Sequence, residues 1–136
     1  MPWHLTTTEA LRDVHRALKD DGLYAANLID HGRLAFARAE VATLARVFEH
    51  VAVMGAPVDI GLDPAATPVG GNLVVLASDR PFDAPAIQKA LDTRETGWRI
   101  ATGDTVTAWT GDVPVLTDDH APVDQLLQPH RTRTVR

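Results

Sequence analysis

The chain contains 136 residues, of which 45% are hydrophobic and 23% are charged. This length suits one compact domain, and the proportions are close to those of ordinary globular proteins, so a packed core is expected. The formal net charge of -5 argues against a nucleic-acid-binding protein, which would normally carry a basic face. The chain has no cysteine, which excludes disulfide bonds, thiolate catalysis and cysteine-ligated zinc.

Residues 1–128 are expected to form this domain, followed by a basic tail over residues 129–136. The first residues have neither the basic segment nor the apolar segment of a signal peptide. No apolar run is long enough to cross a bilayer. We therefore expect a cytoplasmic protein with no membrane partner and no nucleic-acid partner.

The first helix is predicted from residues 6–9 (TTTE), where an N-cap at Thr6 and a glutamate at Glu9 form a capping-box pattern. Apolar residues then recur at helical spacing, and Gly22 is placed to end the helix. These apolar residues are Leu11, Val14 and Leu18. Residues 23–29 follow as a nearly continuous apolar run, which is typical of a strand buried on both faces in a parallel sheet.

A second helix is predicted from an apolar stripe with helical spacing, and charged residues such as Arg38 and Glu40 fall largely off it. The stripe consists of Leu34, Ala37, Val41, Leu44 and Phe48. Apolar runs at residues 51–54 and 73–77 predict two further strands, and Asp83 is placed to cap a third helix. Beyond Gly97 no single period continues.

Helices that alternate with buried strands predict an α/β fold with a mostly parallel sheet. The strands at residues 51–54 and 73–77 have only a loop between them, so they lack the helical crossover that adjacent parallel strands need. We therefore expect this pair to be antiparallel. A mostly parallel sheet that ends in one antiparallel strand is expected for the last part of a methyltransferase-type Rossmann fold.

Four segments are similar, in their order and spacing, to segments of one protein family. They are residues 2–9 (PWHLTTTE), 18–27 (LKDDGLYAAN), 70–78 (GGNLVVLAS) and 116–124 (LTDDHAPVD). Together they resemble the spermidine-synthase-like polyamine aminopropyltransferases, from the segment after the fourth strand onward. The resemblance implies that the chain is the C-terminal half of a class I methyltransferase-like Rossmann fold.

The resemblance also implies an activity, the transfer of an aminopropyl group from decarboxylated S-adenosylmethionine to a diamine. In this family the nucleotide lies on a Gly-rich turn after the first strand, and an acidic catalytic residue lies near the fourth strand; both positions precede Met1. The chain has no Gly-x-Gly-x-x-Gly motif, and Gly70-Gly71 precedes a strand instead of opening a helix. We therefore expect no catalytic residue, no bound cofactor and no activity in this chain alone.

The resemblance places candidate substrate-binding residues at the end of the strand at residues 23–29. Asn27 stands where spermidine synthases carry a substrate-binding glutamine, and Asp30 and His31 follow at the carboxyl end of the strand. Open α/β sheets bind ligands at such ends, and a carboxylate suits a cationic amine. The plainer interpretation, which we favour, is that Asp30-His31-Gly32 is a polar loop that caps the next helix.

Other chemistry-bearing residues do not form a recognisable site. The six histidines show no pair at the spacing of zinc-binding helices, so no metal site is expected. Ser78 lacks the sequence of a nucleophile elbow. Asp118 and Asp119 are interpreted as caps of a short helix after Pro122, with acid–base or cation-binding roles as the alternative. Trp98 and Trp109 are interpreted as core or interface residues, with a ligand contact as the alternative.

The strand at residues 23–29 would lie at an open edge of the sheet if the fourth strand is missing. Natural proteins seldom leave a long apolar edge uncovered, so we expect a homo-oligomer or a missing N-terminal half as the partner. A simpler alternative is that Met1 is an internal position of a longer, complete enzyme. Two functions therefore stand: part of an aminopropyltransferase with a polyamine substrate, or a non-catalytic oligomerisation or interaction module derived from this fold.

Overall fold

A computed structural model describes residues 3–127 of the chain. Its elements are four strands, five α-helices and two short 3-10 helices within that range. The predicted tail over residues 129–136 lies outside the described residues, so its boundary stays a prediction. None of the helices described combines the length and the hydropathy that a membrane span requires.

The sheet is built from strands β1 (Tyr24–His31), β2 (His50–Gly55), β3 (Gly70–Ser78) and β4 (Arg99–Thr102). Their order is β1-β3-β2-β4, and each neighbouring pair is antiparallel. The expectation of a mostly parallel sheet is therefore wrong. β1 and β2 do run in the same direction, but β3 lies between them and takes the hydrogen bonds of both.

The expected antiparallel pairing of the strands at residues 51–54 and 73–77 is confirmed. Val51 stands opposite Ala77 and Val53 opposite Val75 in the β2–β3 ladder. The structural reason is the one expected from the sequence, because the connection between these strands contains only η2 (Pro57–Asp59) and irregular chain. The result is an α/β fold with an antiparallel four-stranded sheet.

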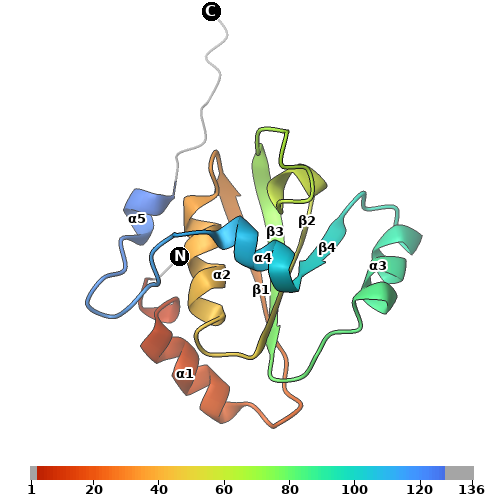
Figure 1. Ribbon diagram of the computed structural model, residues 1–136. Coiled ribbons are helices and arrows are strands. Elements are labelled where there is room, and N and C mark those ends of the chain that lie inside the picture. Colours follow the sequence, from red (N-terminus) through yellow and green to blue (C-terminus); the bar gives the residue numbers. More distant parts are fainter. Residues whose placement is uncertain (1–2, 128–136) are drawn as a thin grey trace, which may run out of the picture.

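The helices are α1 (Thr8–Ala17), α2 (Ala35–Leu44), α3 (Ala84–Thr93), α4 (Gly103–Thr110) and α5 (Val123–Leu126), preceded by η1 (Trp3–Leu5). Figure 1 shows α2 and α4 side by side across one face of the sheet, with α3 beside β4. Asp83 caps α3 as expected, because its side chain accepts a hydrogen bond from the Ala86 N–H. β4 and α4 were not predicted, because β4 has only four residues and Gly103 follows it directly with a positive φ of 55°.

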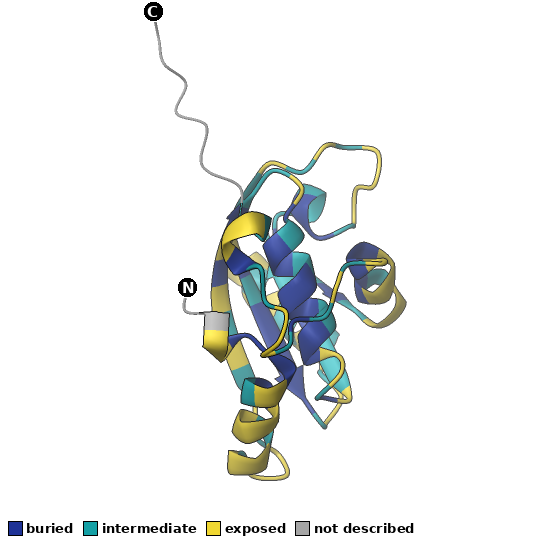
Figure 2. Cartoon of the chain, turned by 90° about the vertical axis from the view of Figure 1, so that its left-hand side faces the viewer, coloured by how far each residue is buried: buried dark blue, intermediate teal, exposed yellow. Residues whose placement is uncertain are grey.

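The predicted stripe of the second helix is confirmed as the centre of the core. Leu34, Ala37, Val41 and Leu44 are fully buried, and Phe48 is 5% exposed. They pack against inward-facing strand residues that include Leu28, Val53, Leu73 and Val75. Figure 2 shows the resulting contrast between α2, which is mostly buried, and α1, which is mostly exposed.

Helix α1 begins one residue later than predicted and ends earlier. Its N-cap is Thr7, whose side chain accepts from the Ala10 N–H, so the capping box with Thr6 is wrong. Glu9 instead accepts a hydrogen bond from the Asp118 N–H at 3.0 Å. The helix ends at Ala17 with Leu18 as the C-cap, so Gly22 forms part of the following turn.

The segment at Leu116 joins the first helix to the central one. The Leu116 N–H donates to the Thr43 hydroxyl of α2 at 2.9 Å. The Leu116 carbonyl accepts from both the N–H and the hydroxyl of Thr8 on α1, at 2.8 and 3.0 Å. The predicted capping role of Asp118 and Asp119 is wrong, because α5 has Pro122 at its N-cap and no side-chain cap.

Strand β1 differs from the expectation that both its faces are covered. Leu28 and Asp30 are buried, but Asn27 and Ile29 point to the other face and are exposed, Ile29 by 59%. β1 also stands at one end of the strand order, and among the described residues it pairs with β3 alone. The apolar run at residues 23–29 therefore contributes one face to the core and leaves the other open.

Candidate functional site

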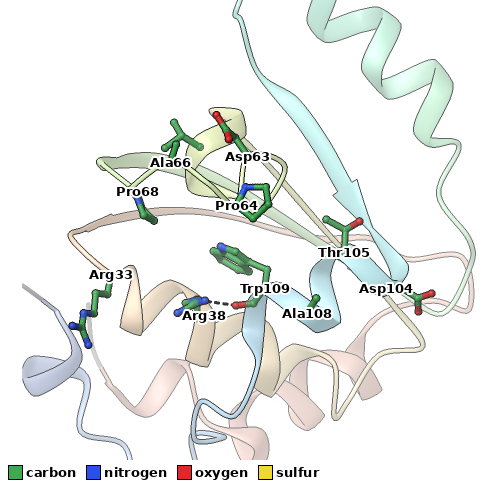
Figure 3. A pocket seen from close by; sticks show the side chains of 12 residues that line it. Arg33, Arg38, Asp63, Pro64, Ala66, Pro68, Asp104, Thr105, Ala108 and Trp109 are labelled. Carbon is green, nitrogen blue, oxygen red and sulfur yellow. Dashed lines mark hydrogen bonds between the residues drawn. The ribbon is translucent and has the colours of Figure 1, made fainter.

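A large cavity lies at the carboxyl ends of β1 and β2. Because these strands run in the same direction, the turn after β1 and the loop after β2 meet at the same end of the sheet. Together with α2 and α4 they enclose a volume of about 690 Å³ (Figure 3). A cavity of this size that combines apolar walls with a few polar groups is the default candidate for a functional site.

The roof of the cavity is the loop between β2 and β3, and Asp59 joins the start of this loop to its end. Asp59 is buried, and its Oδ1 accepts hydrogen bonds from the N–H groups of Val69 and Gly70 at 2.8 and 2.9 Å. Gly61, with a φ of 80°, lies so close to Trp109 that a Cβ atom would come within 3.1 Å of the indole ring. The loop is therefore fixed at its end by Asp59 and on its inner side by Trp109.

Replacing Asp59 with alanine should open this loop. The N–H groups of Val69 and Gly70 would lose their shared acceptor, which costs about 1–3 kcal/mol for each group that stays out of water. Hydrogen exchange of both amides should accelerate in Asp59→Ala, whereas Asp63→Ala, on the same loop, should leave them protected. Equal protection in both variants would show that the carboxylate does not hold the loop.

On the floor of the cavity, an arginine side chain lies against a tryptophan side chain. Arg38 of α2 donates from Nε to the Trp109 carbonyl at 2.7 Å, and its guanidinium carbon lies 5.9 Å from the centroid of the indole ring. Arg33, from the turn after β1, lines the same side, as Figure 3 shows. Trp109 is 7% exposed, so it serves both the core, as predicted, and the cavity wall.

The three predicted substrate-binding residues do not converge. Asn27 is exposed on the open face of the sheet, whereas Asp30 is buried on the opposite face. The two oxygens of Asp30 accept from the backbone N–H of His31 at 2.8 Å and of Ala37 at 2.9 Å. Asp30 thus anchors the start of α2, in agreement with the plainer interpretation. None of the three lines the cavity; their role toward an amine stays a prediction.

A buried carboxyl group that the sequence interpretation missed lies on α2. Glu40 was expected off the apolar stripe, but it is 1% exposed and its Oε2 has no hydrogen-bond partner among the described residues. Burial raises the pKa of Glu40 to about 8. Burial, and to a smaller extent the nearby Glu40, raise the pKa of Tyr24 to about 12. The burial of Glu40 could have been predicted from its spacing, because it is four residues from both Phe36 and Leu44, which are also buried.

A second polar contact joins α1 to two turns away from the cavity. His15 Nε2 lies 2.5 Å from Asp79 Oδ2, and Asp79 Oδ1 accepts from the Glu49 N–H at 3.2 Å. The hydrogen bond from His15, followed by that from the backbone of Glu49, lowers the pKa of Asp79. The Ser78 hydroxyl donates to the Gly22 carbonyl, so it serves the same turns. No three His, Asp or Glu side chains within residues 3–127 form a metal-ligating group.

Comparison with known proteins gives a match in solved structures alone. No family model and no curated protein matches the chain. The crystal structure of a probable spermidine synthase from Corynebacterium glutamicum matches with a TM-score of 0.74 and 29% sequence identity. The match covers 95% of this chain but 46% of that one, so the chain spans less than half of the length of the protein it matches. The resemblance predicted from the sequence is thereby confirmed: this chain is similar to a probable spermidine synthase over nearly its whole length.

Proposed function

We propose that this chain is the half of a spermidine-synthase-like aminopropyltransferase that does not bind the nucleotide. The observation that carries the proposal is the similarity of 95% of the chain to less than half of a probable spermidine synthase. The sequence supports the same assignment, because it contains no Gly-x-Gly-x-x-Gly turn for a nucleotide. In this proposal a second half, on the same polypeptide or on another, binds decarboxylated S-adenosylmethionine.

The edge of β1 is where that second half would join. Within residues 3–127, β1 pairs with β3 on one side and with no strand on the other, and it carries an exposed apolar side chain, Ile29, on its open face. An edge of this kind pairs readily with another strand. A second copy of this chain is the alternative partner and would correspond to a non-catalytic oligomerisation module.

The test is whether the 136-residue chain binds methylthioadenosine, the nucleoside product of aminopropyl transfer. We expect no heat of binding by titration calorimetry and no transfer to putrescine from decarboxylated S-adenosylmethionine. Saturable binding of methylthioadenosine would contradict the proposal, because it would place a nucleotide site within this chain.

The polypeptide mass of the protein from its source, measured under denaturing conditions, then identifies the partner. A species well above the 14.7 kDa of this chain would place the nucleotide half on the same polypeptide. A species at 14.7 kDa would require a separate partner chain, which purification under native conditions should recover. A native 14.7 kDa species that self-associates through β1 and supports no transfer would favour the non-catalytic module instead.

A further inference from the structure

We propose that the cavity between the β2–β3 loop and helices α2 and α4 binds a small molecule with an anionic oxygen group, a carboxylate or a phosphate, on an apolar body. The proposal goes beyond the transferase function and does not depend on it. It concerns Arg33, Arg38 and Trp109, which belong to no motif recognised in the sequence.

The two arginines supply the anion-binding side. Among residues 3–127, no carboxylate lies within ion-pair distance of either guanidinium group. The bond from Arg38 Nε to the Trp109 carbonyl fixes the plane of the guanidinium group but uses one of its five N–H donors. The remaining donors form the planar fork that binds a carboxylate or a phosphate through two parallel hydrogen bonds.

The rest of the cavity suits an apolar body. Pro64 and Pro68 of the loop face the indole of Trp109 across the cavity in Figure 3, and Ala66 and Ala108 add further apolar surface. The volume of about 690 Å³ is in the range of small-molecule sites, which combine apolar walls with a few oriented polar groups. A ligand with one flat apolar part and one anionic group matches this division.

The charge distribution disfavours a diamine in this cavity. A diamine would bring two ammonium groups toward Arg33 and Arg38, where like charges repel. Two carboxylates, Asp63 and Asp104, also line the cavity. Figure 3 shows Asp104 on the side of Trp109 away from the arginines, and Asp63 at the outer side of the loop. The side of the cavity lined by the arginines is therefore cationic.

The experiment follows the indole N–H signal of Trp109 by NMR while three probes are added at constant ionic strength. The probes are benzoate, inorganic phosphate and putrescine. We expect benzoate to shift this signal saturably and putrescine to leave it unchanged. Phosphate that binds as well as benzoate would identify the anionic group as the main determinant, and benzoate alone would identify a carboxylate on an apolar body.

Matched variants test whether the arginines are responsible. Arg33→Gln and Arg38→Gln should each weaken benzoate binding about tenfold, as expected for the loss of a charged hydrogen-bond donor. Arg46→Gln changes the net charge equally at an exposed position after α2 and should bind like the unmodified chain. Absence of binding by both anions, preference for putrescine, or full binding by Arg33→Gln and Arg38→Gln would each overturn the proposal.

Two variants distinguish the loss of the binding site from a loss of folding. Arg33 lies in the turn after β1 and is not part of the hydrophobic core, so its variant tests the site without a change in the core. Arg38→Lys keeps the charge but loses the planar fork, and it should weaken benzoate binding while the urea midpoint of unfolding stays close to that of the unmodified chain. Because methylthioadenosine is not a probe in this titration, failure of the anion site and failure of the transferase proposal are separate results.

Discussion

Raising the pH from 5 to 8 should destabilise this protein, and Glu40→Gln should remove most of that dependence. The pKa of Glu40 is raised to about 8 in the fold by burial, against 4.5 for an unperturbed glutamate. Between these two values the folded chain holds a proton that the unfolded chain releases. The free energy of unfolding should therefore fall by at most about 1.4 kcal/mol per pH unit in this window and level off above pH 8.

The measurement is the urea midpoint of unfolding at half-unit steps from pH 4.5 to 9. Glutamine cannot ionise, so Glu40→Gln should give a nearly flat profile, and its advantage over the unmodified chain should be largest at high pH. Glu95→Gln, at an exposed carboxylate, should keep the slope. The lowered pKa of Asp79 acts in the opposite sense, because its contribution is lost as the pH falls through its folded value, below this window. A flat profile for the unmodified chain would show that Glu40 is ionised or hydrated in the fold.

Leu44→Ala should reduce the free energy of unfolding by about 2–5 kcal/mol, the range observed when a buried leucine is truncated to alanine. Leu44 is fully buried in the cluster that joins α2 to the sheet. The loss combines the transfer of the removed carbons with the cavity that they leave. Leu23→Ala removes the same atoms from a side chain that is 53% exposed and should cost far less. Similar urea midpoints for the two variants would mean that the α2 stripe does not face a rigid core.

The sequence predicted the parts of the fold that depend on local periodicity. The predicted stripe is buried from Leu34 to Phe48, since apolar residues at helical spacing have one favourable environment, although Leu34 is the N-cap of α2 and Phe48 lies after its end. The antiparallel β2–β3 pair was predicted from the absence of a crossover helix. The two-sided burial of β1 was predicted wrongly, because an apolar run does not reveal whether Ile29 faces a core or an open surface.

The candidate cavity could not be predicted because its residues are far apart in the sequence. Arg38 and Trp109 are 71 positions apart, and their contact depends on how α4 packs against α2. Glu40 was missed for another reason: a charged residue was assumed to face solvent, although its position relative to Phe36 and Leu44 placed it inside. Asp30 was identified from the sequence as a polar residue at a strand end, and the structure shows that its carboxylate holds the start of α2.

The hydrogen bonds that join Leu116 to α1 and α2 have a consequence for folding during synthesis. The hydrogen bonds of Leu116 to Thr8 and Thr43 span 108 and 73 residues, so they form only after the ribosome has released nearly the whole described chain. The pairing of β1 likewise requires that β3 has been synthesised, since Tyr24 pairs with Ala77. Domains form as units while the chain emerges N-terminus first, and contacts of high sequence separation slow that step. A nascent chain stalled before residue 116 should therefore leave α1 incompletely packed and exposed to proteases, and synthesis of the segment at Leu116 should protect it.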